Sequence, residues 1–301
     1  MLDQAEHLRR LAASAAQQDR LKQAKKRIPR VITVTSGKGG VGKTSFVVNL
    51  AIVLSRLGKK VTVMDADLGL ANVDVMLGLV PLHTLHDVVQ GRKTLEEILI
   101  TGPEGIKIIA GANGLAELAN LTEKQRGNLI SSLLYLEETA DVLLIDTSAG
   151  LSPSVLSFIF AADELVVITT PDPTAITDAY GIVKVVAKQQ PQPKIKLVVN
   201  LVNSESEGRA IAERFAEVSR KFLQLELQFL GIISNDQHVV RAVRQQLPFV
   251  ISFPRAKAAQ DVQAIAHALL ALPVEAPRGI RGFLARLAAL WEKSGEPEDC
   301  L

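Results

Sequence analysis

Cysteine, aromatic residues and long apolar runs are all scarce in this sequence of 301 residues. The one cysteine, Cys300, is the penultimate residue, which excludes an intramolecular disulfide and a thiolate metal cluster within one chain and suits a reducing cytosol. No eighteen consecutive residues are apolar, so we expect no transmembrane helix. The first thirty residues contain no unbroken apolar segment and carry Asp3 and Glu6 early, which argues against a secretion signal.

A dominant charge of one sign is also lacking, because the formal net charge at pH 7 is only +2. The average hides basic ends: residues 1–30 carry eight Lys and Arg against three Asp and Glu, and residues 278–293 carry four against one. Apolar residues make up 48% and charged residues 22%, the composition of an ordinary soluble globular protein. Disorder throughout, collagen-like repeats and a coiled coil are therefore excluded.

Short β-branched runs alternate with helical stretches through most of the chain. Buried strands are expected at residues 31–35, 61–64, 106–110, 142–145, 165–169, 196–200 and 229–233. Helices are expected between most of them and after the last, at residues 44–57, 122–138, 175–189, 205–222 and 256–272. Near-continuous apolar strands that alternate with helices predict an α/β fold with a mostly parallel, doubly wound sheet covered on both faces.

The two ends of the chain differ from this pattern. The N-terminal segment carries apolar residues at helical spacing and a basic run that stops at Pro29, which predicts a helix followed by a linker. Pro273 and Pro277 bracket a second linker, which precedes a helical stretch at residues 279–293 and an acidic tail. The expected division is therefore an N-terminal helix and linker at 1–29, one large domain at 30–272, and a linker, helix and tail at 273–301.

A glycine-rich segment directly follows the first expected strand and opens the first expected helix. Its residues match the phosphate-loop pattern G-x-x-x-x-G-K-[ST], and they are Gly37, Lys38, Gly39, Gly40, Val41, Gly42, Lys43 and Thr44. Glycine lets backbone N–H groups turn toward phosphate oxygens, and the helix N-terminus adds partial positive charge. Lys43 is expected to reach the β- and γ-phosphates, and the Thr44 hydroxyl to ligate Mg²⁺. The pattern predicts a nucleotide site, with a glycine-rich turn as the alternative.

Aspartates follow two other expected strands. Asp65 and Asp67 stand at the end of the second strand, and Asp146 at the end of a later one. The carboxyl ends of parallel strands lie beside the ligand crevice of such a sheet. Each aspartate alone is equally a turn or cap residue, and Lys38 alone is a solvated loop charge. Together they predict a Mg²⁺–phosphate site in which one carboxylate lies near the metal and another orients water.

Three segments resemble the deviant Walker A ATPases of the MinD/ParA class: Lys38–Thr44, Asp65–Asp74 and Asp146–Gly150. The resemblance extends over residues 30–272. It implies an ATPase that forms a homodimer face to face around two ATP molecules, with Mg²⁺. The lysine that Lys38 matches crosses, in that class, to the phosphates bound by the partner.

The same resemblance implies roles for further positions. Asp67 matches the residue that positions the attacking water, and Asp146 matches the switch aspartate near Mg²⁺. Asn200 matches the adenine-reading asparagine, and no N-K-x-D guanine signature follows it, which favours ATP over GTP. Ser234 departs from the pattern, since many relatives have proline there, and this leaves the contact on the adenine side open.

Several branches of the class are excluded by counting residues. Nitrogenase-iron-protein and iron–sulfur-carrier relatives need cysteine ligands, which Cys300 alone cannot supply. Tyrosine-kinase relatives carry a tyrosine cluster, whereas this chain has two tyrosines, Tyr135 and Tyr180. The arsenite-pump ATPase has two such domains and this chain has one. Partitioning ATPases and membrane-cycling ATPases remain.

The last expected helix favours membrane cycling. At 100° per residue its large apolar side chains fall within an arc of about 120°. They are Ile280, Phe283, Leu284, Leu287, Leu290 and Trp291. Basic flanks and the proline-bounded linker suit a helix that lies in an anionic membrane interface, reversibly, on the inner face of the bacterial cytoplasmic membrane. The alternative is an amphipathic helix docked in a groove of the domain.

The N-terminal segment resembles the DQAxxLR segment of the flagellar-number ATPases, the FlhG (FleN) family. The matching residues are Asp3, Gln4, Ala5, Leu8 and Arg9. In that family the segment docks as a helix on the signal-recognition-type GTPase FlhF and stimulates its hydrolysis. Gln4 is the residue expected to act there, because an amide can orient an attacking water. The alternative is a solvated helix.

The resemblance implies a regulator of flagellum number and placement, with flagellar C-ring or transcription-regulator proteins as further partners. Three other functions stay open. One is a MinD-like division-site ATPase, and the second is a ParA-like DNA-partitioning ATPase, whose DNA binding would fall steeply with salt. The modest charge of the core argues against direct DNA binding. The third is a nucleotide-gated scaffold with negligible turnover.

Overall fold

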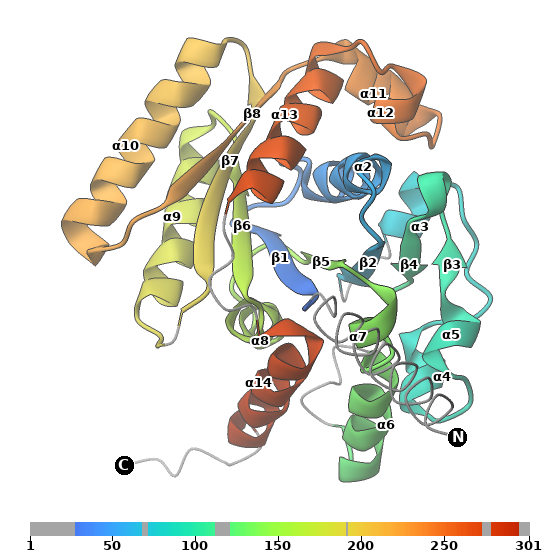
Figure 1. Cartoon of the computed structure of the whole chain (residues 1–301). Helices are drawn as coiled ribbons and strands as arrows, with labels where there is room; N and C mark the ends of the chain where they lie inside the picture. The colour runs from blue at the N-terminus through green and yellow to red at the C-terminus, as the bar shows by residue number, and fades with distance from the viewer. Residues whose placement is uncertain (1–27, 68–71, 112–120, 191, 273–277, 295–301) are drawn as a thin grey trace, which may run out of the picture.

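An eight-stranded sheet forms the centre of the computed structural model, which describes residues 28–67, 72–111, 121–190, 192–272 and 278–294 (Figure 1). Its strand order is β3-β4-β2-β5-β1-β6-β7-β8. The strands are β1 (Arg30–Ser36), β2 (Val61–Ala66), β3 (Ile100–Thr101), β4 (Lys107–Ile109), β5 (Val142–Thr147), β6 (Glu164–Thr169), β7 (Lys194–Val202) and β8 (Gln228–Ser234). Every neighbouring pair is parallel except β3 and β4, which are antiparallel. The predicted α/β fold with a mostly parallel sheet is thus confirmed.

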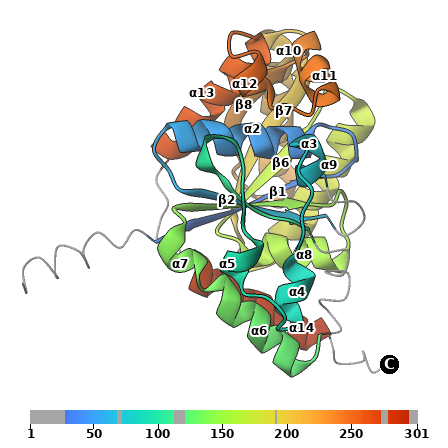
Figure 2. The same ribbon diagram turned by 90° about the vertical axis from the view of Figure 1, so that its right-hand side faces the viewer.

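Helices cover both faces of the sheet (Figure 2). One face packs against α2 (Lys43–Arg56), α3 (Val73–Met76), α11 (Gln237–Arg244), α12 (Phe249–Ser252) and α13 (Lys257–Ala271). The other packs against α4 (Leu85–Val89), α5 (Leu95–Ile98), α6 (Glu123–Leu133), α7 (Leu136–Thr139), α8 (Pro153–Ala161), α9 (Pro173–Ala187), α10 (Glu205–Leu223) and α14 (Gly279–Ser294). A short 3₁₀ turn, η1 (Pro103–Gly105), lies against α2.

The continuous apolar strands explain this double cover. In β1, Ile32 and Val34 belong to the cluster under α2 and α13, whereas Val31 belongs to the cluster on the opposite face. Because successive side chains of a strand point to opposite faces, a strand that is apolar throughout needs a helix layer on each side. Side-chain N-caps mark where many of the helices begin, and these caps are Thr94, Thr122, Ser152, Asp172, Ser204 and Asp236.

The expected helix at residues 122–138 is divided in the structure. It forms α6 and α7, which are separated at Leu134 and Tyr135. The short elements β3, α3, α4, α5, α11 and α12, and the longer α8, were not expected. Most of these elements are too short for a hydrophobic period to be recognised in the sequence. The helix α8 is almost uniformly apolar, so its sequence shows little amphipathic period.

The C-terminal helix α14 packs against α8, α6, α7 and the start of β1. Its buried residues are Ile280, Phe283, Leu284, Leu287 and Trp291, and Leu290 is half-buried. Phe283 stacks on Phe158 of α8, with ring centroids 6.5 Å apart. The side chains expected to face a membrane therefore lie mainly in the core of the domain, which corrects that expectation for this conformation. The physical reason is that an exposed apolar groove on the domain offers the same side chains an equally apolar environment without a membrane.

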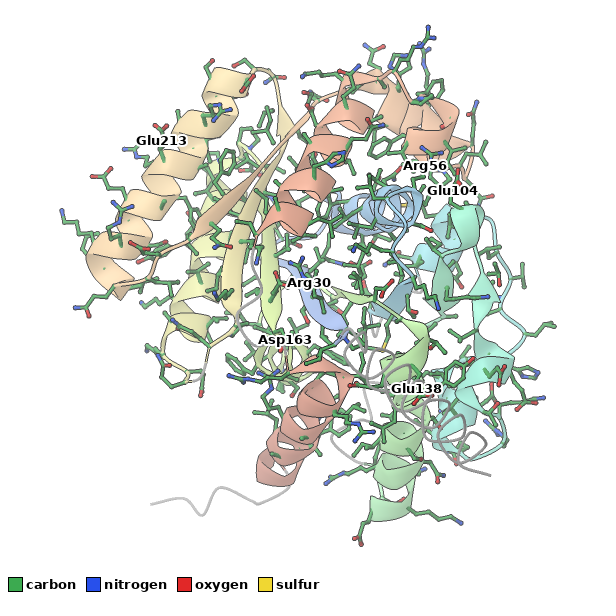
Figure 3. The ribbon with its side chains drawn as sticks, viewed as in Figure 1. Arg30, Arg56, Glu104, Glu138, Asp163 and Glu213 are labelled. Atoms are coloured by element: carbon green, nitrogen blue, oxygen red, sulfur yellow. The ribbon has the colours of Figure 1, made fainter. Side chains whose placement is uncertain are left out.

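Polar contacts at the amino end of the sheet hold α14 in this position. Asp163, which precedes β6, accepts hydrogen bonds from the Arg278 backbone N–H and from the Arg286 guanidinium, each at 3.2 Å. The Arg281 N–H donates to a carboxylate oxygen of Glu137 at 3.3 Å. Figure 3 shows Asp163 at the start of α14, close to Arg30. No helix in the described part of the chain is long and apolar enough to cross a membrane.

Candidate nucleotide site

The phosphate loop connects β1 to α2 at the carboxyl end of the sheet. Gly42 caps α2 with φ of 86°, in the left-handed region that favours glycine. A Cβ at Gly42 would also lie 2.4 Å from the side-chain nitrogen of Asn200, and a Cβ at Gly37 would lie 2.3 Å from the Asp178 backbone in α9. The loop therefore needs glycine at both positions. Gly42 is required by its backbone conformation and by the closeness of Asn200, and Gly37 by the closeness of α9 alone.

Lys43 and Thr44 both contact Asp146, the aspartate at the end of β5. The Lys43 ammonium donates to one carboxylate oxygen of Asp146 at 2.6 Å, and the Thr44 hydroxyl donates to the other at 2.6 Å. Burial raises the pKa of Asp146, and the Lys43 charge opposes that shift. The structure thus brings together three of the residues predicted to serve phosphate and Mg²⁺.

Asp65 shapes the loop that follows β2. Its carboxylate accepts hydrogen bonds from the backbone N–H groups of Asp67 at 3.0 Å, Asn72 at 2.9 Å and Val73 at 3.1 Å. Burial raises the pKa of Asp65 to about 6, and the Asp146 carboxylate adds to the rise, because the two residues are paired on adjacent strands. Asp65 is therefore a buried anchor for the loop that carries Asp67.

Both carboxylate oxygens of Asp67 accept a hydrogen bond. The Ser148 hydroxyl donates to one oxygen at 2.9 Å, and the Asn72 side-chain amide donates to the other at 3.0 Å. Ser148 belongs to the loop after β5, and Asn72 precedes α3. The residue predicted to position water is thus held between two loops of the site.

Lys38 points away from the phosphate loop to the start of α9. Its ammonium donates to Asp172 at 2.9 Å and to the Thr174 hydroxyl at 2.8 Å. The bonds from Lys38 and Thr174 lower the pKa of Asp172 to about 2. The lysine and aspartate side chains are 47% and 43% exposed, so this ion pair contributes little to stability and is easily broken.

Asn200 contacts the phosphate loop directly. Its side-chain amide donates to the Val41 carbonyl at 2.7 Å, and its oxygen accepts from the Leu201 N–H at 2.8 Å. Leu201 has φ of 59°, a strained conformation for this residue, at the place where the pairing of β7 with β8 is irregular. Asn200 therefore pins the loop, a role that the sequence did not predict, while its role as an adenine reader remains a proposal.

Ser234 bonds to α13 in a way that proline cannot. Its backbone N–H and its hydroxyl donate to the same carboxylate oxygen of Asp261, at 2.9 and 2.6 Å. A cavity of about 490 Å³ lies beside it, lined in part by Asn203, Asn235 and His238. The departure from the family pattern thus ties β8 to α13, and the cavity lies at the carboxyl ends of β7 and β8.

The comparisons with known proteins agree with this geometry. A family model described as "ParA: NUBPL iron-transfer P-loop NTPase" matches residues 27–270. The chain belongs to the ParA/MinD family of P-loop ATPases. Its one cysteine cannot form the cluster of thiolates that iron–sulfur carriage needs within one chain.

Flagellar regulators are among the similar members of this family. The chain is 41% identical over 260 residues to the antiactivator FleN of Pseudomonas aeruginosa, which covers 86% of this chain and 93% of that protein. It is 35% identical over 264 residues to the flagellum site-determining protein YlxH of Helicobacter pylori, covering 86% and 89%. The structure of the septum site-determining protein MinD from Pyrococcus horikoshii with Mg-ADP is similar at a TM-score of 0.66, with 26% identity, covering 80% of this chain and 96% of that one. The resemblance to the FlhG (FleN) family is thus confirmed, and the chain is an ATP-binding ParA/MinD ATPase.

The residues of this ParA/MinD site fit Mg²⁺. The Thr44 hydroxyl and the Asp146 carboxylate are adjacent hard oxygen donors, and Asp65 and Asp67 place two further carboxylates nearby. Burial raises the pKa values of Asp65 and Asp146, and a divalent cation would favour the charged form of both carboxylates. Mg²⁺ usually takes one or two protein ligands and completes its shell with phosphate and water. Accordingly, no group of three or more metal-binding side chains is needed, and none is found among the described residues.

Three residues of the site had no predicted role, namely Asn72, Asp172 and Thr174, and Ser148 was predicted only as part of the loop after the switch aspartate Asp146. The sequence did contain a signal for Asp172, because Asp172-Pro173 has the form of an N-cap followed by proline at the first helical position. Ser148 and Asn72 lie within segments that carry the family resemblance, but their partner is set by folding. The predicted activator residues Asp3, Gln4, Ala5, Leu8 and Arg9 lie outside the described part of the chain.

Proposed function

We propose that this ATPase is an ATP-driven dimer switch that regulates flagellum number or placement from the inner face of the cytoplasmic membrane. The observation that carries the proposal is the nucleotide site, in which Asp146 holds Lys43 and Thr44 while Lys38 is held apart by an exposed ion pair with Asp172. The names of its relatives, an antiactivator and a flagellum site-determining protein, support the flagellar role. Flagellar C-ring or transcription-regulator proteins are the further partners that this role suggests.

The phosphate-loop residues would bind ATP in this cycle. Lys43 would exchange Asp146 for the β- and γ-phosphates, and Thr44 and Asp146 would hold Mg²⁺, the latter through water. Mg²⁺ supplies neutralisation of the phosphate charge. Asn200 would contact adenine from its place beside Val41. Asp67 would orient the attacking water.

Lys38 would act across the dimer. Its present pair with Asp172 is exposed and weak, so a partner's phosphates, which carry more charge, would replace that carboxylate. Homodimer formation would therefore bring two lysines to two ATP molecules without a large cost in stability.

Membrane attachment would require α14 to leave the domain. The same face, with Phe283 and Leu287 at its centre, is buried in either location, so the difference in free energy between docked and membrane-bound states is small compared with either burial term. One released helix would bind weakly and reversibly. Two helices in an ATP-held dimer would raise the apparent affinity by about 10²–10⁴ through effective concentration.

Sedimentation with vesicles tests this step. The parental protein is expected to sediment with vesicles that contain anionic lipid when ATP is present, and to remain in the supernatant with ADP. Asp163→Asn weakens the bonds to Arg278 and Arg286, so it is expected to increase sedimentation with ADP several-fold. Glu213→Ala, a change on the exposed surface of α10, is the matched control (Figure 3). Equal sedimentation of the parental protein with ATP and ADP would contradict the proposal.

The N-terminal segment would stimulate FlhF. Its described end supports a link to α14, because a Cβ at Gly279 would lie 2.7 Å from the Ile28 side chain. Ile28 at the end of the segment and Gly279 at the start of α14 therefore lie side by side, so release of the helix would change the surroundings of Ile28.

The GTPase activity of FlhF measures this role. A peptide of residues 1–20 is expected to accelerate GTP hydrolysis, and the same peptide with Gln4→Ala is not, because the amide that orients water is removed. Gln17→Ala in the same peptide is the matched control, since it lies outside the DQAxxLR segment. The role of Gln4 is excluded if the Gln4→Ala and Gln17→Ala peptides act equally.

A further inference from the structure

The loops after β2 and β5 meet at one side-chain hydrogen bond. The Ser148 hydroxyl donates to the Asp67 carboxylate at 2.9 Å, across a separation of 81 residues. The second oxygen of that carboxylate accepts from the Asn72 amide at 3.0 Å. Two donors on two oxygens fix the plane of the carboxylate.

The loop that carries Ser148 is itself fixed to β1. The Thr147 hydroxyl donates to the Val34 carbonyl at 3.2 Å, and the Gly150 N–H donates to the Ser36 carbonyl at 2.9 Å. Ser148 stands between these two anchors. Its hydroxyl is therefore presented to Asp67 from a rigid element, which is the condition for precise positioning.

Ser148 also lies two residues after Asp146, which contacts Lys43 and Thr44 of the phosphate loop. A change in the contacts of Asp146 when nucleotide binds would thus be passed along the same short loop to Asp67. This continuity distinguishes Ser148 from Asn72, which belongs to the loop of Asp67 itself.

We propose that Ser148 is a positioning residue for ATP hydrolysis, which holds Asp67 in the orientation that aligns the attacking water. The inference rests on the proposed role of Asp67 in hydrolysis. Ser148 does not contact the reacting atoms in this scheme; it acts through the carboxylate. Its loss should lower the rate of the chemical step and leave nucleotide affinity unchanged, because phosphate binding is assigned to Lys43 and Thr44, which Asp146 holds.

Steady-state ATP hydrolysis by the full chain, with Mg²⁺ and vesicles containing anionic lipid, tests the proposal. In Ser148→Ala we expect kcat to fall about tenfold, the scale of one hydrogen bond to a charged group, with KM within about twofold of the parental value. Ser148→Thr keeps the hydroxyl and is expected to retain most of kcat. Ser131→Ala, on the exposed side of α6, is the matched control. Asp67→Asn is expected to lose nearly all turnover while still binding ATP.

Three outcomes would overturn the inference. The first is a kcat of Ser148→Ala within about twofold of the parental value when Asp67→Asn is inactive. The second is a loss in Ser148→Ala that appears in KM and in ATP affinity and that Ser148→Thr does not restore, which would show a structural role. The third is parental turnover in Asp67→Asn, which would remove the proposed role of Asp67 and so identify the proposed function as the point of failure.

Discussion

Replacing Lys43 with alanine is expected to lower ATP turnover at least about 100-fold, the usual effect of removing one fixed charge from a site that stabilises developing phosphate charge. Lys43 is 8% exposed and is fixed beside Asp146, so its ammonium is already desolvated before ATP arrives. Preorganisation of this kind makes the electrostatic contribution large, because little reorganisation is needed during the reaction.

The same substitution should also weaken binding of ATP, which equilibrium titration with a fluorescent ATP analogue would measure. Lys43→Arg keeps the charge but enlarges the side chain in a closely packed site, so it should recover part of the affinity and little of the turnover. Lys184→Ala, an exposed lysine of α9, is the matched control for loss of one positive charge. Turnover of Lys43→Ala within tenfold of the parental rate would be incompatible with this phosphate site.

The parts of the site that the sequence predicts are those set by local geometry. The phosphate loop is contiguous, and its glycines, Lys43 and Thr44 have roles fixed by the turn from β1 to α2. Asp67 and Asp146 stand at the carboxyl ends of strands, which a parallel sheet places at one edge, and the structure adds that β2 and β5 are neighbours.

The parts that the sequence did not predict depend on tertiary contacts. Ser148 and Asp172 are ordinary loop and cap residues until folding places them against Asp67 and Lys38. The location of α14 has a similar origin, since its apolar arc fits a membrane or a groove equally well and no local pattern distinguishes the two. Phe158 of α8, against which Phe283 stacks, belongs to a helix that the hydrophobic period did not reveal.

A buried group of three charges at the amino end of the sheet gives the second large prediction. Glu164 begins β6 and accepts two hydrogen bonds from the Arg30 guanidinium, both at 2.7 Å, and one from the Lys196 ammonium. Arg30 also donates to the Leu269 carbonyl near the end of α13 at 2.9 Å. Burial alone would raise the pKa of Glu164, but the two cations outweigh it and hold that pKa below its usual value of 4.5. Glu164 is therefore the one anion that neutralises both cations within this group.

Glu164→Ala is expected to lower the free energy of unfolding by about 3–5 kcal/mol, because it leaves the buried Lys196 and the half-buried Arg30 without their counter-charge. Urea unfolding at pH 7.5 measures the change, and Glu213→Ala on the surface of α10 should stay within about 0.5 kcal/mol of the parental value.

The sign of the pH dependence follows from the lowered pKa of Glu164 in the folded state. The stabilisation by ionised Glu164 is fully present above pH 4.5, the pKa of this carboxyl in the unfolded chain. It is lost as the pH falls through the lower pKa that Glu164 has in the folded protein. The difference in free energy of unfolding between the parental protein and Glu164→Ala should therefore become smaller in acid. A difference below about 1 kcal/mol at pH 7.5 would contradict the prediction, because it would show that the two cations reach water or another anion when Glu164 is absent.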